Sequence, residues 1–126
     1  MEIKDLAKQI SEIAISKGWR DGEQNFAADI ANFHDEISET WREHANNHDI
    51  NEIYFKCNMT LQCMDYPLKC ETCKNAKPCG IPIELFDAIS RILEACVYYG
   101  IDIEKAAKLK MEFNKSRPYR HGNKRA

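Results

Sequence analysis

The sequence lacks long apolar runs, a strong net charge and a leader-like beginning. No apolar run among the 126 residues approaches the ~20 residues that a membrane-spanning helix needs. Residues 1–6 have no signal-peptide character, so we expect a cytoplasmic protein. The net charge is −2, from 18 basic and 20 acidic residues, which indicates neither nucleic acid nor a membrane as a partner. The length fits one domain, 1–126.

Strand-like alternation is also scarce, since only the short run Ile53–Phe55 shows it. Apolar residues instead recur at helical spacing in four segments, about 3–17, 25–46, 82–99 and 103–117. Gly18 and Gly100 suit helix ends, and Asp102 can cap the fourth segment. The pattern predicts an all-α protein with the four segments packed as a bundle.

Two acidic pairs stand at helical i, i+3 spacing, Glu36 with Glu39 and Glu84 with Asp87. If the second and third helices pack antiparallel, the two pairs can face each other. Four carboxylates gathered beside a core repel one another and resist desolvation, and a hard divalent cation such as Mg²⁺ removes that conflict. The spacing by itself favours the plainer interpretation, in which the glutamates face solvent.

A line of polar donors follows on the fourth segment. Lys110, Asn114 and Arg117 are each three or four residues apart, so they share one helix face. Arginine offers a planar fork to phosphate oxygens and lysine a point charge, which suits a metal-bound polyphosphate. The alternative is a solvated basic face at a helix C-terminus, favoured by the helix dipole.

Taken together, these motifs resemble the MazG-like nucleoside triphosphate pyrophosphohydrolases, whose pattern is E-x-x-E followed by E-x-x-D. Residues 80–89 resemble the metal helix of that family, 98–104 its next turn and 110–122 its phosphate-binding end. The resemblance covers the second to fourth helices. It implies the four-helix bundle of that family and Mg²⁺, replaceable by Mn²⁺, on Glu36, Glu39, Glu84 and Asp87.

The resemblance also implies a reaction, in which a (d)NTP is hydrolysed to the (d)NMP and pyrophosphate. Glu39 would orient or deprotonate the attacking water, and Lys110 would offset charge on the leaving pyrophosphate. Further substrate-binding residues would be Asn114, Arg117, Tyr119, Arg120 and His121. Trp41, His34 or Trp19 can stack on the base, although core packing is the favoured interpretation of Trp41. Nothing identifies the base or the sugar.

A cysteine-rich insertion, 55–80, lengthens the connection between the acidic pairs to forty-four residues. It contains a Cys70-x-x-Cys73 pair that suits two thiolates on one zinc ion. In the light of the resemblance, Cys79 stands at an ordinary start of the metal helix. The predicted ligands of a structural zinc are therefore Cys57, Cys63, Cys70 and Cys73. Free thiols and an iron–sulfur cluster are the alternatives, and Cys96 is expected in the core.

Other classes of protein are less well supported. A carboxylate-bridged di-iron bundle would use Glu-x-x-His, which the sequence does not contain. A non-enzymatic interaction protein with a working zinc loop would have no use for the Lys110 face. A phosphoribosyl-ATP pyrophosphohydrolase would share the fold and the metal chemistry. Broad apolar faces, which include Tyr98 and Tyr99, predict a homodimer or homotetramer.

Overall fold

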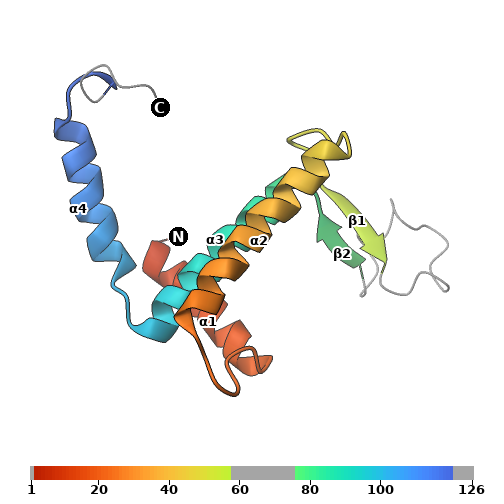
Figure 1. The fold of residues 1–126 in the computed structure, drawn as a ribbon, viewed down its shortest axis with the longest axis horizontal. Coiled ribbons are helices and arrows are strands. Elements are labelled where there is room, and N and C mark those ends of the chain that lie inside the picture. The colour runs from red at the N-terminus through yellow and green to blue at the C-terminus, as the bar shows by residue number, and fades with distance from the viewer. Residues whose placement is uncertain (1, 58–75, 121–126) are drawn as a thin grey trace. The chain divides into compact units, whose positions relative to one another are not determined.

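The computed structural model describes residues 2–57 and 76–120. In these residues the chain forms four helices and one two-stranded sheet (Figure 1). In chain order the elements are α1 (Ile3–Ser16), α2 (Phe26–Ala45), β1 (Tyr54–Cys57), β2 (Ala76–Cys79), α3 (Ile81–Tyr99) and α4 (Ile103–Ser116). The prediction of a mainly helical protein is confirmed, with the small sheet as an addition. No helix in these two ranges is long and apolar enough to cross a membrane.

The helix ends lie close to their predicted positions because the capping residues act locally. The Asn25 side chain accepts hydrogen bonds from the backbone N–H groups of Ala27 and Ala28, which begins α2. The Asp102 side chain accepts one from the N–H of Lys105 at 3.0 Å, which begins α4. Gly18 and Gly100 follow α1 and α3 with φ of 76° and 68°, the left-handed conformation expected after a helix end.

The sheet pairs β1 with β2 in antiparallel register, so that Tyr54 lies opposite Cys79 and Cys57 opposite Ala76. The run Ile53–Phe55 signals β1, but β2 was not predicted, because its sequence Ala-Lys-Pro-Cys has no apolar alternation. Proline is tolerated here, since both strands of a two-stranded sheet are edges. The sheet brings the two ends of the cysteine-rich insertion together directly before α3.

The chain divides into two compact units, Gly22–Ile92 on the one hand and Met1–Asp21 with Leu93–Ala126 on the other. In the second of these, Arg20 pairs with Glu94 through two contacts, Nε to Oε2 at 2.7 Å and NH2 to Oε1 at 2.5 Å. The Arg20 guanidinium also lies 4.2 Å from the ring centre of Tyr98. This largely buried ion pair joins the segment after α1 to the last turns of α3.

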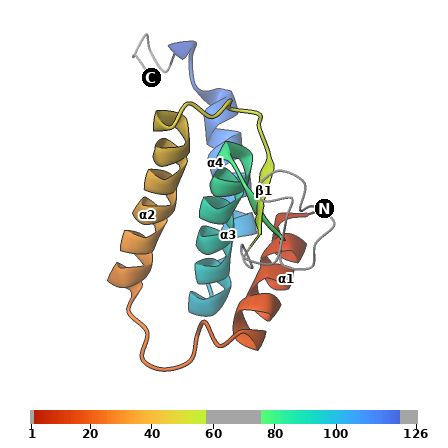
Figure 2. The same ribbon diagram turned by 90° about the vertical axis from the view of Figure 1, so that its right-hand side faces the viewer.

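In the unit Gly22–Ile92, α2 and the first part of α3 lie side by side and run in opposite directions, as Figures 1 and 2 both show. Arg91 Nε of α3 donates to Glu36 Oε1 of α2 at 2.7 Å. Ile81 and Ala88 of α3 are buried, and so is Cys79 at the end of β2. The antiparallel packing of the second and third predicted helices is therefore found.

The predicted apolar stripe of α2 is not buried in this chain. Trp41 is 64 % exposed and Ile37 55 %, and Phe26 and Ile30 are exposed as well. The buried residue of α2 is instead Glu36. The expectation that Trp41 packs in the core was wrong. The apolar stripe and the acidic residues lie on different sides of the helix, and α3 covers the acidic side.

Gly80 connects β2 to α3 in a conformation that excludes a side chain. Its φ is +119°, and a Cβ at this position would lie 2.2 Å from the backbone oxygen of Glu52. We expect Gly80→Ala to lower the free energy of unfolding by about 1–3 kcal/mol more than Gly22→Ala does. Gly22 is the matched control, because it also has a positive φ but open space around its Cβ position. Urea denaturation of both variants measures the difference, and equal losses would contradict the clash.

Candidate metal centre

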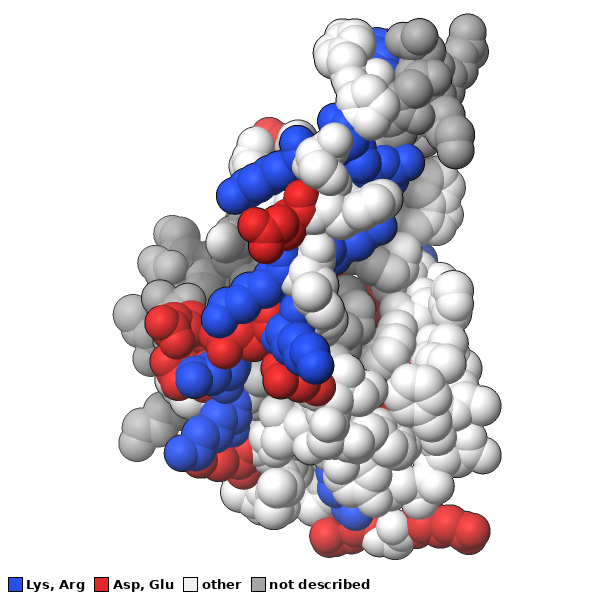
Figure 3. Space-filling model, turned by 90° about the vertical axis from the view of Figure 1, so that its left-hand side faces the viewer, with Lys and Arg blue, Asp and Glu red and all other residues white. Residues whose placement is uncertain are grey.

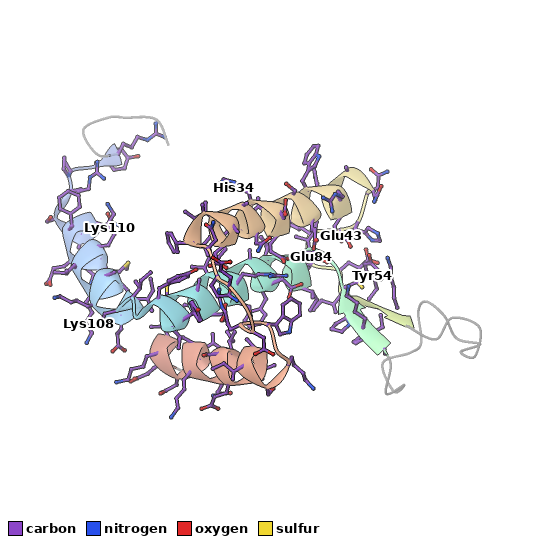
Figure 4. All side chains as sticks on the ribbon, turned by 60° about the horizontal axis from the view of Figure 1, so that its bottom comes forward. His34, Glu43, Tyr54, Glu84, Lys108 and Lys110 are labelled. Atoms are coloured by element: carbon purple, nitrogen blue, oxygen red, sulfur yellow. The ribbon has the colours of Figure 1, made fainter. Side chains whose placement is uncertain are left out.

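Carboxylates from α2 and α3 meet between the two helices. One oxygen each from Glu36, Glu39 and Glu84 lie within 4.8 Å of one another, close enough to share a cation. Helical spacing places Glu36 and Glu39 on one side of α2, and the antiparallel packing turns that side toward the first turn of α3. Figure 4 shows Glu84 between the two helices, with Glu43 of α2 beside it.

Of the three carboxylates, Glu84 has the environment that most disfavours a negative charge. Glu84 is only 9 % exposed, and its Oε2 has no hydrogen-bond partner among the described residues. Burial, a hydrogen bond with Glu39 and the charges of Asp87, Glu39 and Glu43 raise the pKa of Glu84 from 4.5 to about 7. A buried carboxylate oxygen with nothing to satisfy it calls for a proton or a cation.

Asp87, the fourth predicted ligand, is half-buried one turn further along α3. Burial raises its pKa, and the charge of Glu39 acts in the same direction, while Lys77 and Arg91 act against it. Asp87 is thus within electrostatic reach of the other carboxylates, although its oxygens are not in the closest group. The four residues fit a hard divalent cation, since all offer oxygen and their mutual repulsion disfavours the empty cluster.

This repulsion predicts how the stability of the metal-free protein depends on pH. The pKa of Glu84 is higher in the folded protein, about 7, than its ordinary value of 4.5, so the folded state holds the proton more tightly. The contribution to stability is complete below about pH 4.5 and is lost as the pH rises through 7, by about 1.4 kcal/mol per pH unit at the steepest. Urea denaturation in EDTA at pH 5 and pH 8 measures it. Glu84→Gln should flatten the difference, and an unchanged slope in that variant would contradict the assignment.

Sequence reasoning missed Arg91, and it placed Glu43 on the acidic face of the second helix without giving it a role in the cluster. Arg91 holds Glu36, and its spacing from Glu84 and Asp87, seven and four residues, is the signal that could have placed it on the same face of α3. Glu43 continues the line of Glu36 and Glu39 on α2. It accepts hydrogen bonds from the Tyr54 hydroxyl at 2.8 and 2.9 Å, so strand β1 is joined to the acidic side of α2.

Around Glu43 the connection from α2 to β1 forms a network of its own. His48 Nε2 lies 3.4 Å from Glu43, and His48 Nδ1 lies 3.0 Å from Glu52. The His48 ring stacks on Tyr54 with ring centres 4.7 Å apart. The hydrogen bond to Glu43 and burial raise the pKa of the Tyr54 hydroxyl, burial most of all. The network holds the start of the insertion against the end of α2.

Of the predicted phosphate-binding residues, Lys110 and Asn114 are on α4 and the others follow the end of that helix, in the other unit. Lys110 Nζ and the Arg117 guanidinium lie 5.1 and 5.3 Å from the ring centre of Phe113, although Arg117 is the C-cap of α4 and has an extended backbone. Lys and Arg side chains follow α4 in Figure 3. Asn114 is exposed, as are Tyr119 and Arg120, and His121 lies outside the described residues. Their approach to the carboxylates stays a prediction.

The base-stacking candidates are all at the surface of the chain. Trp41 and Trp19 are 64 % and 63 % exposed, and His34 is exposed as well. The Trp41 ring is tilted against that of His44, with ring centres 5.8 Å apart. These positions leave each of the three side chains accessible to a ligand.

Of the predicted zinc ligands, Cys63, Cys70 and Cys73 lie outside the described residues. The backbone of Cys57 forms the last position of β1. Cys79 and Cys96 are free and buried, and burial raises the pKa of each thiol. The Cys79 thiol donates to the backbone oxygen of Lys77 at 3.5 Å. The expectation that Cys96 belongs to the core is confirmed.

Comparisons of the chain with protein-family models, with curated proteins and with solved structures found no match. The resemblance to MazG-like enzymes therefore depends on the motifs themselves.

Proposed function

We propose that the chain is a Mg²⁺-dependent nucleoside triphosphate pyrophosphohydrolase that cleaves a (d)NTP into the (d)NMP and pyrophosphate. The observation that carries the proposal is the group of Glu36, Glu39 and Glu84 with the buried, unpartnered Oε2 of Glu84. Exposed acidic residues are common on helices that bind no metal ion. A carboxylate oxygen that is buried among other carboxylates without a hydrogen-bond partner is costly unless a proton or a cation satisfies it.

Bound Mg²⁺ would supply charge for phosphate oxygens and lower the pKa of a water molecule. Glu36, Glu39, Glu84 and Asp87 would hold the ion, with Glu39 the ligand least occupied by it. Glu39 is half-buried, and it would accept a proton from the attacking water. The water oxygen would bond to the α-phosphorus while the bond between that phosphorus and the bridging oxygen breaks. Pyrophosphate leaves with that oxygen and the electron pair of the bond. Mn²⁺, which accepts the same oxygen ligands, would replace Mg²⁺.

In the same proposal α4 supplies the substrate contacts. Lys110 and Arg117, aligned over Phe113, would offset charge on the leaving pyrophosphate, with Asn114 donating a hydrogen bond. The further contacts proposed from the motif are Tyr119, Arg120 and His121, with Trp41 stacking on the base. The four helices would then complete a MazG-like bundle around the nucleotide. With this activity the protein would serve in the cytoplasm to control the composition of the nucleotide pool.

A homo-oligomer is part of the proposal, because many large apolar side chains of the helices are exposed, and such surfaces favour association. The exposed residues include Phe26, Ile30, Ile37 and Trp41 on α2 and Leu109, Met111 and Phe113 on α4. We expect a dimer or tetramer by sedimentation velocity at micromolar concentration. Trp41→Glu should shift the protein toward monomer, while Lys8→Glu on the exposed side of α1 should not. A monomeric wild-type protein would contradict this prediction.

The proposed activity is tested by incubating the protein with each NTP and dNTP and Mg²⁺ and analysing the products. Pyrophosphate together with the nucleoside monophosphate supports the proposal. Orthophosphate with the diphosphate would indicate a different hydrolase, and turnover of phosphoribosyl-ATP alone would indicate a phosphoribosyl-ATP pyrophosphohydrolase. No turnover of any nucleotide, with Mn²⁺ in place of Mg²⁺ as well, would favour a binding protein on the same scaffold.

A further inference from the structure

Arg91 is a permanent cation placed among residues that the proposed function assigns to a metal. It is on the same face of α3 as Glu84 and Asp87, and its Nε lies 2.7 Å from Glu36 Oε1. A guanidinium does not lose its charge at any pH a folded protein tolerates. The Glu36 side chain is 10 % exposed and that of Arg91 is 38 % exposed, so the pair is only partly screened by water.

The charges around the cluster can be counted from the described residues. Four carboxylates, Glu36, Glu39, Glu84 and Asp87, contribute −4. Arg91 and Lys77, the two cations that act on Asp87, contribute +2, so −2 is left, which one divalent ion cancels. Glu43 also acts on Glu84 and the Tyr54 hydroxyl bound to it carries no charge, so with Glu43 the sum is −3, and a first divalent ion removes most of it.

Glu36 is also occupied as a ligand. A second divalent ion in a site of four carboxylates has to share their oxygens with the first, and one Glu36 oxygen is already taken by Arg91. The second ion would also lie near the guanidinium, which repels it. Both effects act on the second ion far more than on the first, because the first meets the full negative charge of the cluster.

We propose that Arg91 is a built-in cation of this metal centre, which by holding Glu36 limits the nucleotide-free site to a single divalent ion. The inference rests on the proposed function, since it concerns the same carboxylates. Arg91 is in this view a positioning residue, because it acts on the metal centre through its contact with Glu36. It sets how many ions the resting site holds, which no motif in the sequence specifies.

The test is Mn²⁺ binding to metal-free protein without nucleotide, followed by electron paramagnetic resonance and calorimetry. The wild type should bind one Mn²⁺ per chain in the cluster, with the spectrum of an isolated ion. In Arg91→Met the second Mn²⁺ should bind at least about tenfold more tightly, and a spin-coupled pair should appear. Arg42→Met removes an exposed arginine from α2 and should keep the wild-type behaviour.

A coupled pair in the nucleotide-free wild type overturns the inference without any variant, and so does a single ion in a folded Arg91→Met. Arg91→Gln keeps an amide donor for Glu36 while removing the charge, and it replaces Arg91→Met if that variant does not fold. Failure of the proposed function looks different. In that case no Mn²⁺ binds to the wild type or to any of the variants, and the assignment of the carboxylates to a metal falls together with this inference.

Discussion

Glu84→Gln and Asp87→Asn are each expected to reduce turnover of a nucleoside triphosphate by more than about a hundredfold, while the helical circular dichroism stays unchanged. Even residues that only support a metal ligand cost about 10–100-fold when they are replaced, so loss of a ligand should cost more. Each variant removes one negative charge that would face the cation. In the metal-free state Glu84→Gln should raise the thermal stability at pH 8, because an amide at this buried position escapes the repulsion of Glu39 and Asp87.

Asp35→Asn is the control for this experiment. Asp35 is an exposed carboxylate on α2, next in sequence to Glu36, and its loss should leave both turnover and Mg²⁺ binding unchanged. Turnover is measured as pyrophosphate release, and Mg²⁺ affinity by calorimetry. Near-normal turnover in both Glu84→Gln and Asp87→Asn would mean that the metal ligands are misassigned. A stability at pH 8 that falls in metal-free Glu84→Gln would contradict the repulsion between the buried carboxylates.

Protein purified without added metal is expected to contain about one zinc per chain, bound by Cys57, Cys63, Cys70 and Cys73. A closed site of four thiolates has no open position for water, so this zinc should be structural and not catalytic. Removing it should lower the melting temperature by about 4 °C for each kcal/mol of stability lost. Turnover should fall much less than in Glu84→Gln, because the proposed chemistry uses oxygen-bound Mg²⁺.

Cysteine variants make the zinc prediction specific. Cys70→Ser and Cys73→Ser should lose the zinc, measured by elemental analysis. Cys96→Ala should keep it, because Cys96 is a free, buried thiol of α3, and Cys79→Ala should keep it for the same reason at the end of β2. The prediction is contradicted if the wild-type protein contains no zinc and its thiols react freely with a thiol reagent. The cysteines to be tested are Cys57, Cys63, Cys70 and Cys73.

The helices could be predicted from the sequence because their determinants are local. Asn25 and Asp102 cap α2 and α4, and Gly18 and Gly100 follow α1 and α3, in each case through contacts within a few residues. The strand β2 could not be predicted in this way. Its four residues contain a lysine and a proline, and they are a strand only because β1 pairs with them across the insertion.

The acidic pairs were recognisable by their spacing, yet spacing could not separate a solvent-facing pair from a buried one. The apolar stripe of α2 suggested that Trp41 would be inside, and the packing of α3 on the opposite side of α2 buries Glu36 instead. Helical periodicity shows that a helix has distinct faces. It does not show which face the neighbouring helix covers, because that depends on how the two helices come together.

By itself, then, the sequence determined the four helices, their ends and the candidate carboxylates, since each depends on residues within one or two turns of one another. Only the tertiary structure decided that Glu84 is buried with an unpartnered oxygen, that Arg91 holds Glu36 and that Tyr54 holds Glu43. Arg91 and Glu36 are separated by 55 positions in the chain. The energy of such a pair depends on distance and on the exclusion of water, and both are set by packing between helices and not by local sequence.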